Sequence, residues 1–476
     1  MDNKTKKILD IFEEINKIPR KSKHEEKISK WLCDWAEKNN FEYKTDEVLN
    51  VFIKVPASQG YEKSPIIVLQ GHMDMVCEKT PESPHDFSKD AIKHIFEGDW
   101  LHADQTTLGA DNGIALATAM AIALDEAVKH PELELVFTID EETGLTGANT
   151  LDASYINGKI LLNIDSEDEG VFTVGCAGGR DTHIRLPTEK SELEEDETVY
   201  LLKVGGLLGG HSGVDIKKQR ANANKLLARV LNEISFGSRI IEIAGGTAHN
   251  AISRDAQALI AVKEKLKVKE KIEEFGKIFR NEFKPAEKKV YVYLEASDKK
   301  ISEAFTEETT EKVINLLLAL PHGIIAFSAE LEGLVETSCN AATVITHEDY
   351  VEIKTSQRSS VMSRLDAITF KIEATAKLAG AKVESGNGYP AWQPDTESPL
   401  LAKCVKTYEE LFDKKPVVEI IHAGLECGVI GSKIEGMDMI SLGPTIKNPH
   451  SPDECLFVPS VKKIWDFLVR LLESYK

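Results

Sequence analysis

Short apolar runs alternate with helix-like stretches in the first part of this chain, and most of the runs end at a histidine or an acidic residue. Residues 66–70, 133–139 and 160–164 have the length and composition of buried strands. Residues 113–124, rich in Ala, Leu and Met, have the length of a helix, and two amphipathic helices precede them within residues 6–41. Strands that alternate with helices predict an α/β fold, with a mostly parallel sheet and helices on both faces.

The pattern changes near residue 187. Residues 187–390 contain β-branched strands and charged amphipathic helices, which are typical of two successive α+β units. The stretch GNGYPAWQP at 386–394 is rich in turn residues, and alternating strands and helices resume after it. We therefore expect a catalytic domain formed by residues 1–186 and 391–476, interrupted by an inserted α+β lid domain at 187–390.

The composition excludes several kinds of partner and site. Asp and Glu number 78 against 58 Lys and Arg, and the formal charge of −20 disfavours nucleic acid or an anionic membrane as a partner. The seven cysteines are scattered without a C-x-x-C pair, so a disulfide framework or a thiolate zinc site is not expected. No apolar run approaches the roughly 20 residues of a membrane-spanning helix. The first residues do not resemble a signal peptide, so we expect a cytoplasmic protein.

A histidine and an aspartate stand at the end of the first apolar strand, in GHMD at 71–74. Residues i and i+2 of an extended segment face the same way, so Asp74 can hydrogen-bond the imidazole of His72. This arrangement orients a metal-binding histidine. A second H-x-D pair, His102 and Asp104, follows no comparable strand and is expected to be local loop structure.

Four further segments carry groups that bind metals. Asp111 precedes a helix, where an aspartate is commonly an N-cap. The three acids at 140–142 follow an apolar strand, and crowding them there is costly unless cations or protons offset their charge; a solvated acidic turn is the alternative. Asp165 again follows a strand, and His450 lies in a turn-rich loop after another. Because ligands in open α/β sheets bind beyond the carboxyl ends of the strands, these residues are expected to converge.

The number of ligands fits two metal ions. A catalytic zinc ion takes about three protein ligands, and five residues supply six positions only if one carboxylate bridges. We expect His72, Asp111 and Asp165 on one ion and Asp111, Glu142 and His450 on the other. Glu141 is left as the general base for a metal-bridging water. Neighbouring residues of a strand face opposite ways, so Glu141 and Glu142 can both face the metals only if the backbone turns there.

Motifs along nearly the whole chain carry a resemblance to a known family. They include PRKSKHEE at 19–26, TLGADNG at 107–113, DSEDEG at 165–170, GCAGG at 175–179, GGHSG at 209–213, RANANK at 220–225, HAGLECG at 422–428 and GPTIKNPHSPD at 443–453. The sequence resembles the zinc aminoacylase/carboxypeptidase superfamily and, within it, the Xaa-His dipeptidases, which include enzymes that act on carnosine. The resemblance implies the same five metal ligands, with Asp74 and Glu141 catalytic.

The resemblance also implies roles that the ligand count does not reach. His211, which by itself could be an ordinary loop histidine, would stabilise the oxyanion of the reaction. Asn250 and Arg358 would hold the C-terminal carboxylate of the peptide, a task that suits the guanidinium fork. Gly424 and Glu426 would line the substrate pocket. The neighbouring His249 is expected to be a surface or packing residue.

The functional prediction is a cytosolic metallo-dipeptidase with two zinc ions per subunit, in which cobalt or manganese could replace zinc. Its substrates would be small Xaa-His peptides such as carnosine. The alternatives are a related metal-dependent amidohydrolase, acting on N-acyl amino acids or tripeptides, and a metal-binding homologue without activity. A homodimer is possible, because in relatives with small lids a partner subunit can supply the lid histidine.

Overall fold

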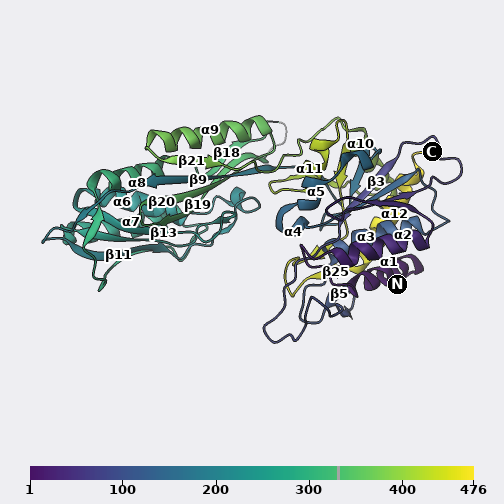
Figure 1. Cartoon of the computed structure of the whole chain (residues 1–476), viewed down its shortest axis with the longest axis horizontal. Helices are drawn as coiled ribbons and strands as arrows, with labels where there is room; N and C mark the ends of the chain where they lie inside the picture. Colours follow the sequence, from purple (N-terminus) through teal and green to yellow (C-terminus); the bar gives the residue numbers. More distant parts are fainter. Residues whose placement is uncertain (330–332) are drawn as a thin grey trace. The chain divides into compact units, whose positions relative to one another are not determined.

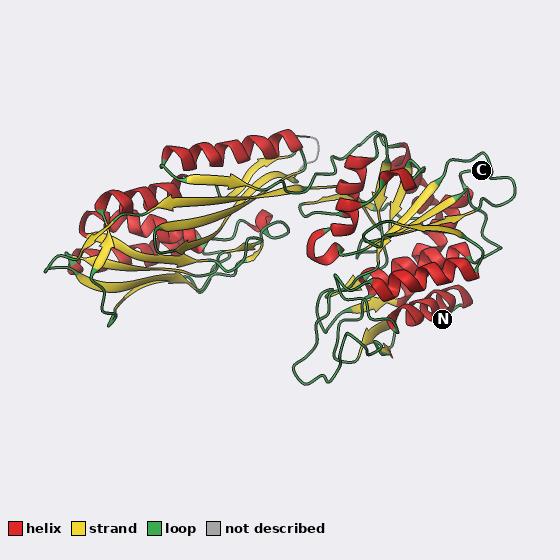
Figure 2. Cartoon of the chain, viewed as in Figure 1, coloured by secondary structure: helices red, strands yellow, loops and turns green. Residues whose placement is uncertain are grey.

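The computed structural model describes residues 1–329 and 333–476, which form two compact units (Figure 1). Unit 1 contains Met1–Cys176, Pro394–Ile420 and Leu425–Lys476. Unit 2 contains Ala177–Gln393 and Ile421–Gly424. Unit 2 is therefore an insertion in the chain of unit 1. Helices and strands are mixed in both units (Figure 2).

An eight-stranded sheet forms the centre of unit 1, in the order β1-β2-β6-β3-β7-β23-β8-β22. These strands are β1 (Glu42–Thr45), β2 (Val51–Val55), β3 (Ile67–His72), β6 (Leu133–Thr138), β7 (Ile160–Asn163), β8 (Val171–Cys176), β22 (Val417–Ile421) and β23 (Asp438–Ser441). The central strands β6, β3, β7 and β23 pair in parallel. The pairs β1–β2, β2–β6 and β23–β8 are antiparallel.

Helices cover both faces of this sheet. Every residue of β3 and β6 is buried, as expected for parallel strands between helical layers. Gly71 faces α3 (Ala110–Ala123), since a side chain at this position would approach the Cβ of Ala115 to 2.9 Å. The preceding Gln70 points to the opposite face and donates to Glu426 of α11 (Glu426–Lys433) at 2.6 Å. The predicted α/β class is confirmed.

The other helices of unit 1 are α1 (Asn3–Asn16), α2 (Glu26–Lys38), α4 (Glu141–Gly144), α5 (Thr146–Thr150), α10 (Pro399–Phe412) and α12 (Val458–Glu473). A small sheet has the order β24-β25-β5-β4. Its strands are β4 (His94–Glu97), β5 (Trp100–Ala103), β24 (Ile446–Lys447) and β25 (Cys455–Phe457).

Unit 2 is an α+β fold with a nine-stranded antiparallel sheet. Its strands are β9 (Gly178–Pro187), β11 (Thr198–Gly205), β13 (Ser238–Gly245), β15 (Ala256–Val262), β16 (Tyr291–Ala296), β18 (Gly323–Phe327), β19 (Val335–Thr346), β20 (Tyr350–Ser359) and β21 (Lys382–Ser385). The main core of the unit includes apolar residues of α6 (Ala223–Ile234), α7 (Lys265–Glu282), α8 (Glu307–Ala319) and α9 (Met362–Leu378). Two short pairs complete it, β10 (Lys190–Glu192) with β17 (Glu303–Phe305) and β12 (Gly210–His211) with β14 (Ala251–Ile252).

Two features of unit 2 differ from the sequence-based expectation. The two α+β halves share one continuous sheet, because β13 of the first half pairs with β19 of the second. The unit also begins at Ala177 rather than at residue 187, because β9 pairs along its whole length with β20. Among the described residues, no helix is long and apolar enough to cross a membrane.

Candidate metal centre

Five metal-binding side chains converge within unit 1. His72 is the last residue of β3, and Asp165 comes just after the neighbouring strand β7. Glu142 lies in the short helix α4, which follows β6 on the other side of β3. Asp111 lies at the start of α3, and His450 lies in the loop between β24 and β25. The parallel pairing of β6, β3 and β7 therefore brings three of these segments to one edge of the sheet.

One group of donor atoms is centred on His72. Its Nε2 atom lies 3.0 Å from Oδ1 of Asp111 and 3.4 Å from Oδ1 of Asp165. A second group is centred on His450, whose Nε2 lies 3.1 Å from Oδ2 of Asp111 and 3.0 Å from Oε2 of Glu142. In each group the donor atoms all lie within 4.8 Å of one another. The two oxygens of Asp111 thus face different histidines.

Asp74 fixes the orientation of the His72 ring. Its Oδ1 atom lies 3.2 Å from Nδ1 of His72, and its Oδ2 atom accepts a hydrogen bond from the Ser22 hydroxyl at 2.8 Å. Both His72 and Asp74 are buried. With Nδ1 turned to this carboxylate, Nε2 faces Asp111 and Asp165.

The backbone turns at Asp140, so that the two neighbouring glutamates can face the same site. Asp140 has a left-handed conformation (φ 47°, ψ 45°), and the helical turn of α4 begins directly after it. Its carboxylate accepts hydrogen bonds from the hydroxyls of Thr143 and Thr146. Donor atoms of His72, Glu141 and Glu142 consequently lie within 4.8 Å of one another, which explains how adjacent residues reach one cluster.

Burial and crowding shift the pKa values of the cluster in opposite directions. Burial raises the pKa of Asp165 to about 6 and raises that of Glu141 well above its ordinary value. Hydrogen bonds to Asp111 and Glu142 raise the pKa of His450 to about 11. The negative charges of these crowded carboxylates must be offset. Without metal cations, only protons on the histidines or carboxyl groups can offset them.

The residues present fit a pair of divalent metal ions. Imidazole nitrogens and carboxylate oxygens are the ligands that zinc and similar ions take in catalytic sites. Ligand atoms at about 2.0–2.2 Å from a tetrahedral ion lie roughly 3.4 Å apart, close to the separations within each group. Oε1 of Glu142 is buried without a hydrogen-bond partner in the described part of the chain, which leaves an acceptor for a cation.

Of the predicted substrate-binding residues, Glu426 belongs to unit 1 and the remaining four belong to unit 2, namely His211, Asn250, Arg358 and Gly424. His211 of β12 pairs with Ala251 of β14, directly after Asn250. The Nδ1 atom of His211 accepts the backbone N–H groups of Gly213 and Val214, each at 3.2 Å. Burial lowers the pKa of His211, which favours the neutral ring, and because Nδ1 is an acceptor in both contacts the ring proton is assigned to Nε2. This leaves an N–H donor free to bind an anionic oxygen.

Arg358 and Gly424 both lie against Tyr389 of the same unit. Arg358 is buried and donates from Nη1 to the Tyr389 hydroxyl at 2.8 Å. The Nε atom of Arg358 has no hydrogen-bond partner in the described part of the chain. A side chain at Gly424 would approach the Tyr389 ring to 2.8 Å. Arg358 is thus a buried cation with unused donor capacity, which a carboxylate would satisfy.

The chain matches the family model of peptidase family M20/M25/M40 over residues 68–474. It belongs to this family. It is 41% identical over 473 residues to the cytosol non-specific dipeptidase of Escherichia coli (strain K12), a match that covers 98% of this chain and 97% of that protein. The chain is a metallo-dipeptidase, a metal-dependent hydrolase that acts on small peptides.

Solved structures share the fold. The aminoacylhistidine dipeptidase of Vibrio alginolyticus has a TM-score of 0.91 and 38% identity, with 98% of this chain and 96% of that chain covered. A tripeptidase of Staphylococcus aureus subsp. aureus Mu50 has a TM-score of 0.57 and 16% identity, with 99% and 98% covered. At that identity the tripeptidase shows the fold alone.

Glu426 and His102 of this M20 peptidase both lie in regular secondary structure of unit 1. Glu426 is buried in unit 1, where Oε2 accepts hydrogen bonds from Gln70 at 2.6 Å and Thr138 at 2.7 Å. Its Oε1 atom has no hydrogen-bond partner in the described part of the chain, and its place in the substrate pocket stays a prediction. His102 lies in strand β5 rather than in a loop, and belongs to none of the groups of donor atoms described above.

The sequence analysis did not find the residues that bind the backbone next to the proposed metal ligands. Arg20 is buried and donates to the carbonyl oxygens of Asp74 at 3.0 Å and Gly109 at 2.7 Å. Glu25 accepts the backbone N–H of Asp140 at 3.0 Å. With Ser22, both residues lie in the motif PRKSKHEE, which the resemblance includes without giving it a role. The motif is rich in charged residues, which are usually exposed. Its composition therefore gives no sign that its arginine is buried.

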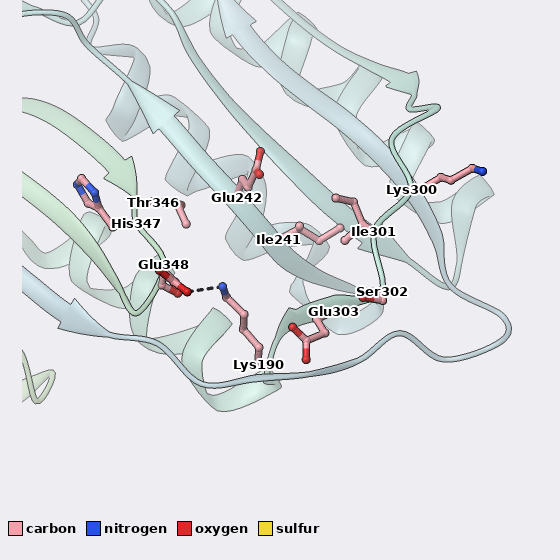
Figure 3. Close-up of a pocket in the computed structure, with 10 residues that line it drawn as sticks. All are labelled: Lys190, Ile241, Glu242, Lys300, Ile301, Ser302, Glu303, Thr346, His347 and Glu348. Carbon is pink, nitrogen blue, oxygen red and sulfur yellow. Dashed lines mark hydrogen bonds between the residues drawn. The ribbon is translucent and has the colours of Figure 1, made fainter.

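Unit 2 of this M20 peptidase also has a cavity of about 410 Å³ (Figure 3). Lys190 and Lys300 line it together with Glu242, Glu303 and Glu348, and Lys190 donates to the backbone oxygen of Glu348 at 2.9 Å. None of the predicted site residues lines this cavity. It is therefore separate from the metal and substrate residues described above.

Proposed function

We propose that the chain is a dinuclear zinc dipeptidase that hydrolyses Xaa-His dipeptides, carnosine among them. The observation that carries the proposal is the division of the Asp111 carboxylate between two histidines, at 3.0 Å from His72 and 3.1 Å from His450. A carboxylate whose two oxygens face two different histidines can bind one metal ion through each oxygen, as a bridging ligand does. His72, Asp111 and Asp165 would hold one ion, and Asp111, Glu142 and His450 the other.

The metal ions, when bound, would acidify a water molecule and polarise the peptide carbonyl. Zinc is the proposed metal, and cobalt or manganese would bind the same nitrogen and oxygen ligands. Asp74 would keep His72 in the ligand orientation through its contact with Nδ1.

Glu141 is the proposed general base. Its position in the turn after β6, beside Glu142, supports this role because its carboxylate lies with the donor atoms of His72 and Glu142. Glu141 would take a proton from the attacking water and return it to the leaving amine.

The proposed substrate contacts come from unit 2. The Nε2–H group of His211 would donate a hydrogen bond to the carbonyl oxygen of the peptide as negative charge develops on that oxygen. Arg358 and Asn250 would bind the C-terminal carboxylate of the dipeptide, a role supported by the buried guanidinium with an unused Nε donor.

A substrate panel tests the proposal. Carnosine, other Xaa-His dipeptides, dipeptides without histidine, tripeptides and N-acetyl amino acids would be compared by kcat/KM with the zinc-loaded protein. We expect Xaa-His dipeptides to lead and N-acetyl amino acids to be poor substrates. Dominant turnover of N-acetyl amino acids would instead assign a deacylase, and equal turnover of all dipeptides would assign the broad range that the name of the E. coli relative indicates.

We also propose a cytoplasmic location, in line with the name of the E. coli relative. The homodimer and the absence of nucleic-acid partners stay predictions from the sequence. Sedimentation of the purified protein would test the first of these.

A further inference from the structure

Glu454 accepts hydrogen bonds from four successive backbone N–H groups. Its Oε2 atom accepts from Leu108 at 2.8 Å and Gly109 at 2.9 Å. Its Oε1 atom accepts from Ala110 at 2.8 Å and Asp111 at 3.2 Å. The side chain is 2% exposed, so water does not substitute for these contacts. One buried carboxylate thus binds the whole backbone turn that ends at Asp111.

These N–H groups stand at the start of α3, where a helix has no internal acceptors for them. The backbone is not helical at Asp111 (φ −80°, ψ 105°), so an ordinary helix cap would not fix its direction. The hydrogen bond from the Asp111 N–H to Glu454 holds the backbone from which the Asp111 carboxylate extends.

Arg20 holds the same turn through its carbonyl groups. Its Nη2 atom donates to the carbonyl oxygen of Gly109 at 2.7 Å, while Nη1 donates to that of Asp74 at 3.0 Å. Arg20 is 1% exposed, and its positive charge offsets the buried negative charge of Glu454. The turn is therefore bound on its donor groups by an anion and on an acceptor group by a cation.

Glu454 is also tied to the loop that carries His450. Its own N–H donates to the carbonyl oxygen of Ser451 at 2.9 Å, and the N–H of Asp453 donates to the Ser451 hydroxyl at 3.2 Å. Directly after Glu454, strand β25 pairs with β5. A shift of the Glu454 carboxylate would therefore move both the Asp111 turn and the His450 loop.

We propose that Glu454 is a positioning residue for the metal centre. It joins the His450 loop to the Asp111 turn and so keeps one Asp111 oxygen facing His72 and the other facing His450. This inference rests on the proposed function, in which Asp111 is the ligand shared by both ions. It adds the residue that sets the direction of that ligand.

Glu134 provides a matched control for a purely structural role. It is another buried carboxylate of unit 1, and it accepts backbone N–H groups from Asn157 at 2.9 Å and Gly158 at 3.0 Å. In the described part of the chain its hydrogen bonds go to Asn157 and Gly158, and to none of the five proposed ligands. Glu134→Gln and Glu454→Gln therefore make the same chemical change at two buried backbone-binding sites.

The test measures zinc binding to the metal-stripped protein by calorimetric titration, together with thermal unfolding of the same metal-free samples. We expect Glu454→Gln to bind zinc about 10- to 100-fold more weakly than wild type, the range found when groups that orient ligands are replaced. We expect Glu134→Gln to keep wild-type zinc affinity, while both variants lose similar thermal stability. Wild-type zinc affinity in Glu454→Gln, or an equal loss of affinity in Glu134→Gln, would overturn the inference.

A second variant covers the case in which Glu454→Gln does not fold. Glu454→Asp keeps the charge but is one methylene shorter, so it cannot reach all four N–H groups. We expect a weaker affinity for zinc and an altered absorption spectrum of the cobalt-loaded protein. A wild-type affinity and spectrum in Glu454→Asp would contradict the positioning role. Failure of the wild-type chain itself to bind two ions would instead contradict the proposed function.

Discussion

The Oδ1 atom of Asp74 accepts the backbone N–H of Glu141 at 3.1 Å. The same carboxylate accepts the N–H of Glu142 through Oδ2 at 3.3 Å and contacts Nδ1 of His72 at 3.2 Å. Asp74 therefore fixes two things at once, the ring of a proposed ligand and the turn that carries the proposed base. Its importance lies in joining the end of β3 to the end of β6.

Replacement of Asp74 by Asn tests this double role. Both oxygens of Asp74 face N–H groups, those of the His72 ring and of the acidic turn. In Asn one of these oxygens becomes an NH2 group, which cannot accept a hydrogen bond, so the contacts on that side would be lost. We expect metal affinity, measured by titration with zinc, to fall roughly 10- to 100-fold. Ser22→Ala, which removes only one donor to Asp74, should change it far less. Equal effects of the two substitutions would argue against the double role.

Glu141→Gln separates catalysis from metal binding. Because Glu141 is the proposed base and not a ligand, the variant should lose about 100- to 10,000-fold in kcat while it keeps the wild-type metal content. Hydrolysis of carnosine and elemental analysis of the same sample provide the two measurements. Loss of metal from this variant would make Glu141 a ligand or a structural residue.

His211→Ala tests the proposed oxyanion donor. The neutral ring, with its proton on Nε2, should contribute mainly in the transition state, so we expect kcat to fall about 100- to 1,000-fold with little change in metal content. The matched control is His249→Ala, since His249 is exposed and pairs with Asp181 at 2.7 Å. If both variants lost activity equally, His211 would have no special role.

His322 predicts a pH-dependent stability of unit 2. Burial lowers its pKa from the ordinary 6.5 to about 4, and its Nδ1 accepts the N–H of Ala341 at 3.4 Å. Between these values the folded form binds fewer protons than the unfolded form, so stability is lost as pH falls from about 6.5 to 4.

A glutamine at this position does not titrate. We therefore expect the Tm of His322→Gln to decline less steeply than that of wild type over this pH range. The corresponding difference in the free energy of unfolding between the two proteins should reach about 1–3 kcal/mol at pH 4. Parallel Tm curves for the two proteins between pH 7 and 4 would rule out His322 as the cause.

The sequence predicts the metal cluster because its ligands follow strand ends. His72 and Asp165 come directly after apolar runs, and parallel strands carry their last residues to one edge. The sequence also indicates that the backbone must turn if adjacent Glu141 and Glu142 are to face one site, and in the structure Asp140 makes this turn.

Other parts of the structure depend on long-range geometry that no local pattern reveals. The joining of both halves of unit 2 into one sheet depends on the pairing of β13 with β19, far apart in the chain. Glu454 directly follows the motif that ends at Asp453, but an acid before a short strand carries no sign that it binds four N–H groups elsewhere. The same holds for the buried Arg20.

The most direct test of the central claim is the metal content of active, purified protein, measured with its hydrolysis of dipeptides before and after chelation. We expect about two transition-metal ions per chain, loss of turnover when they are removed, and recovery with added zinc. Protein that holds no transition metal and turns over dipeptides equally well in the presence of chelator would contradict the account.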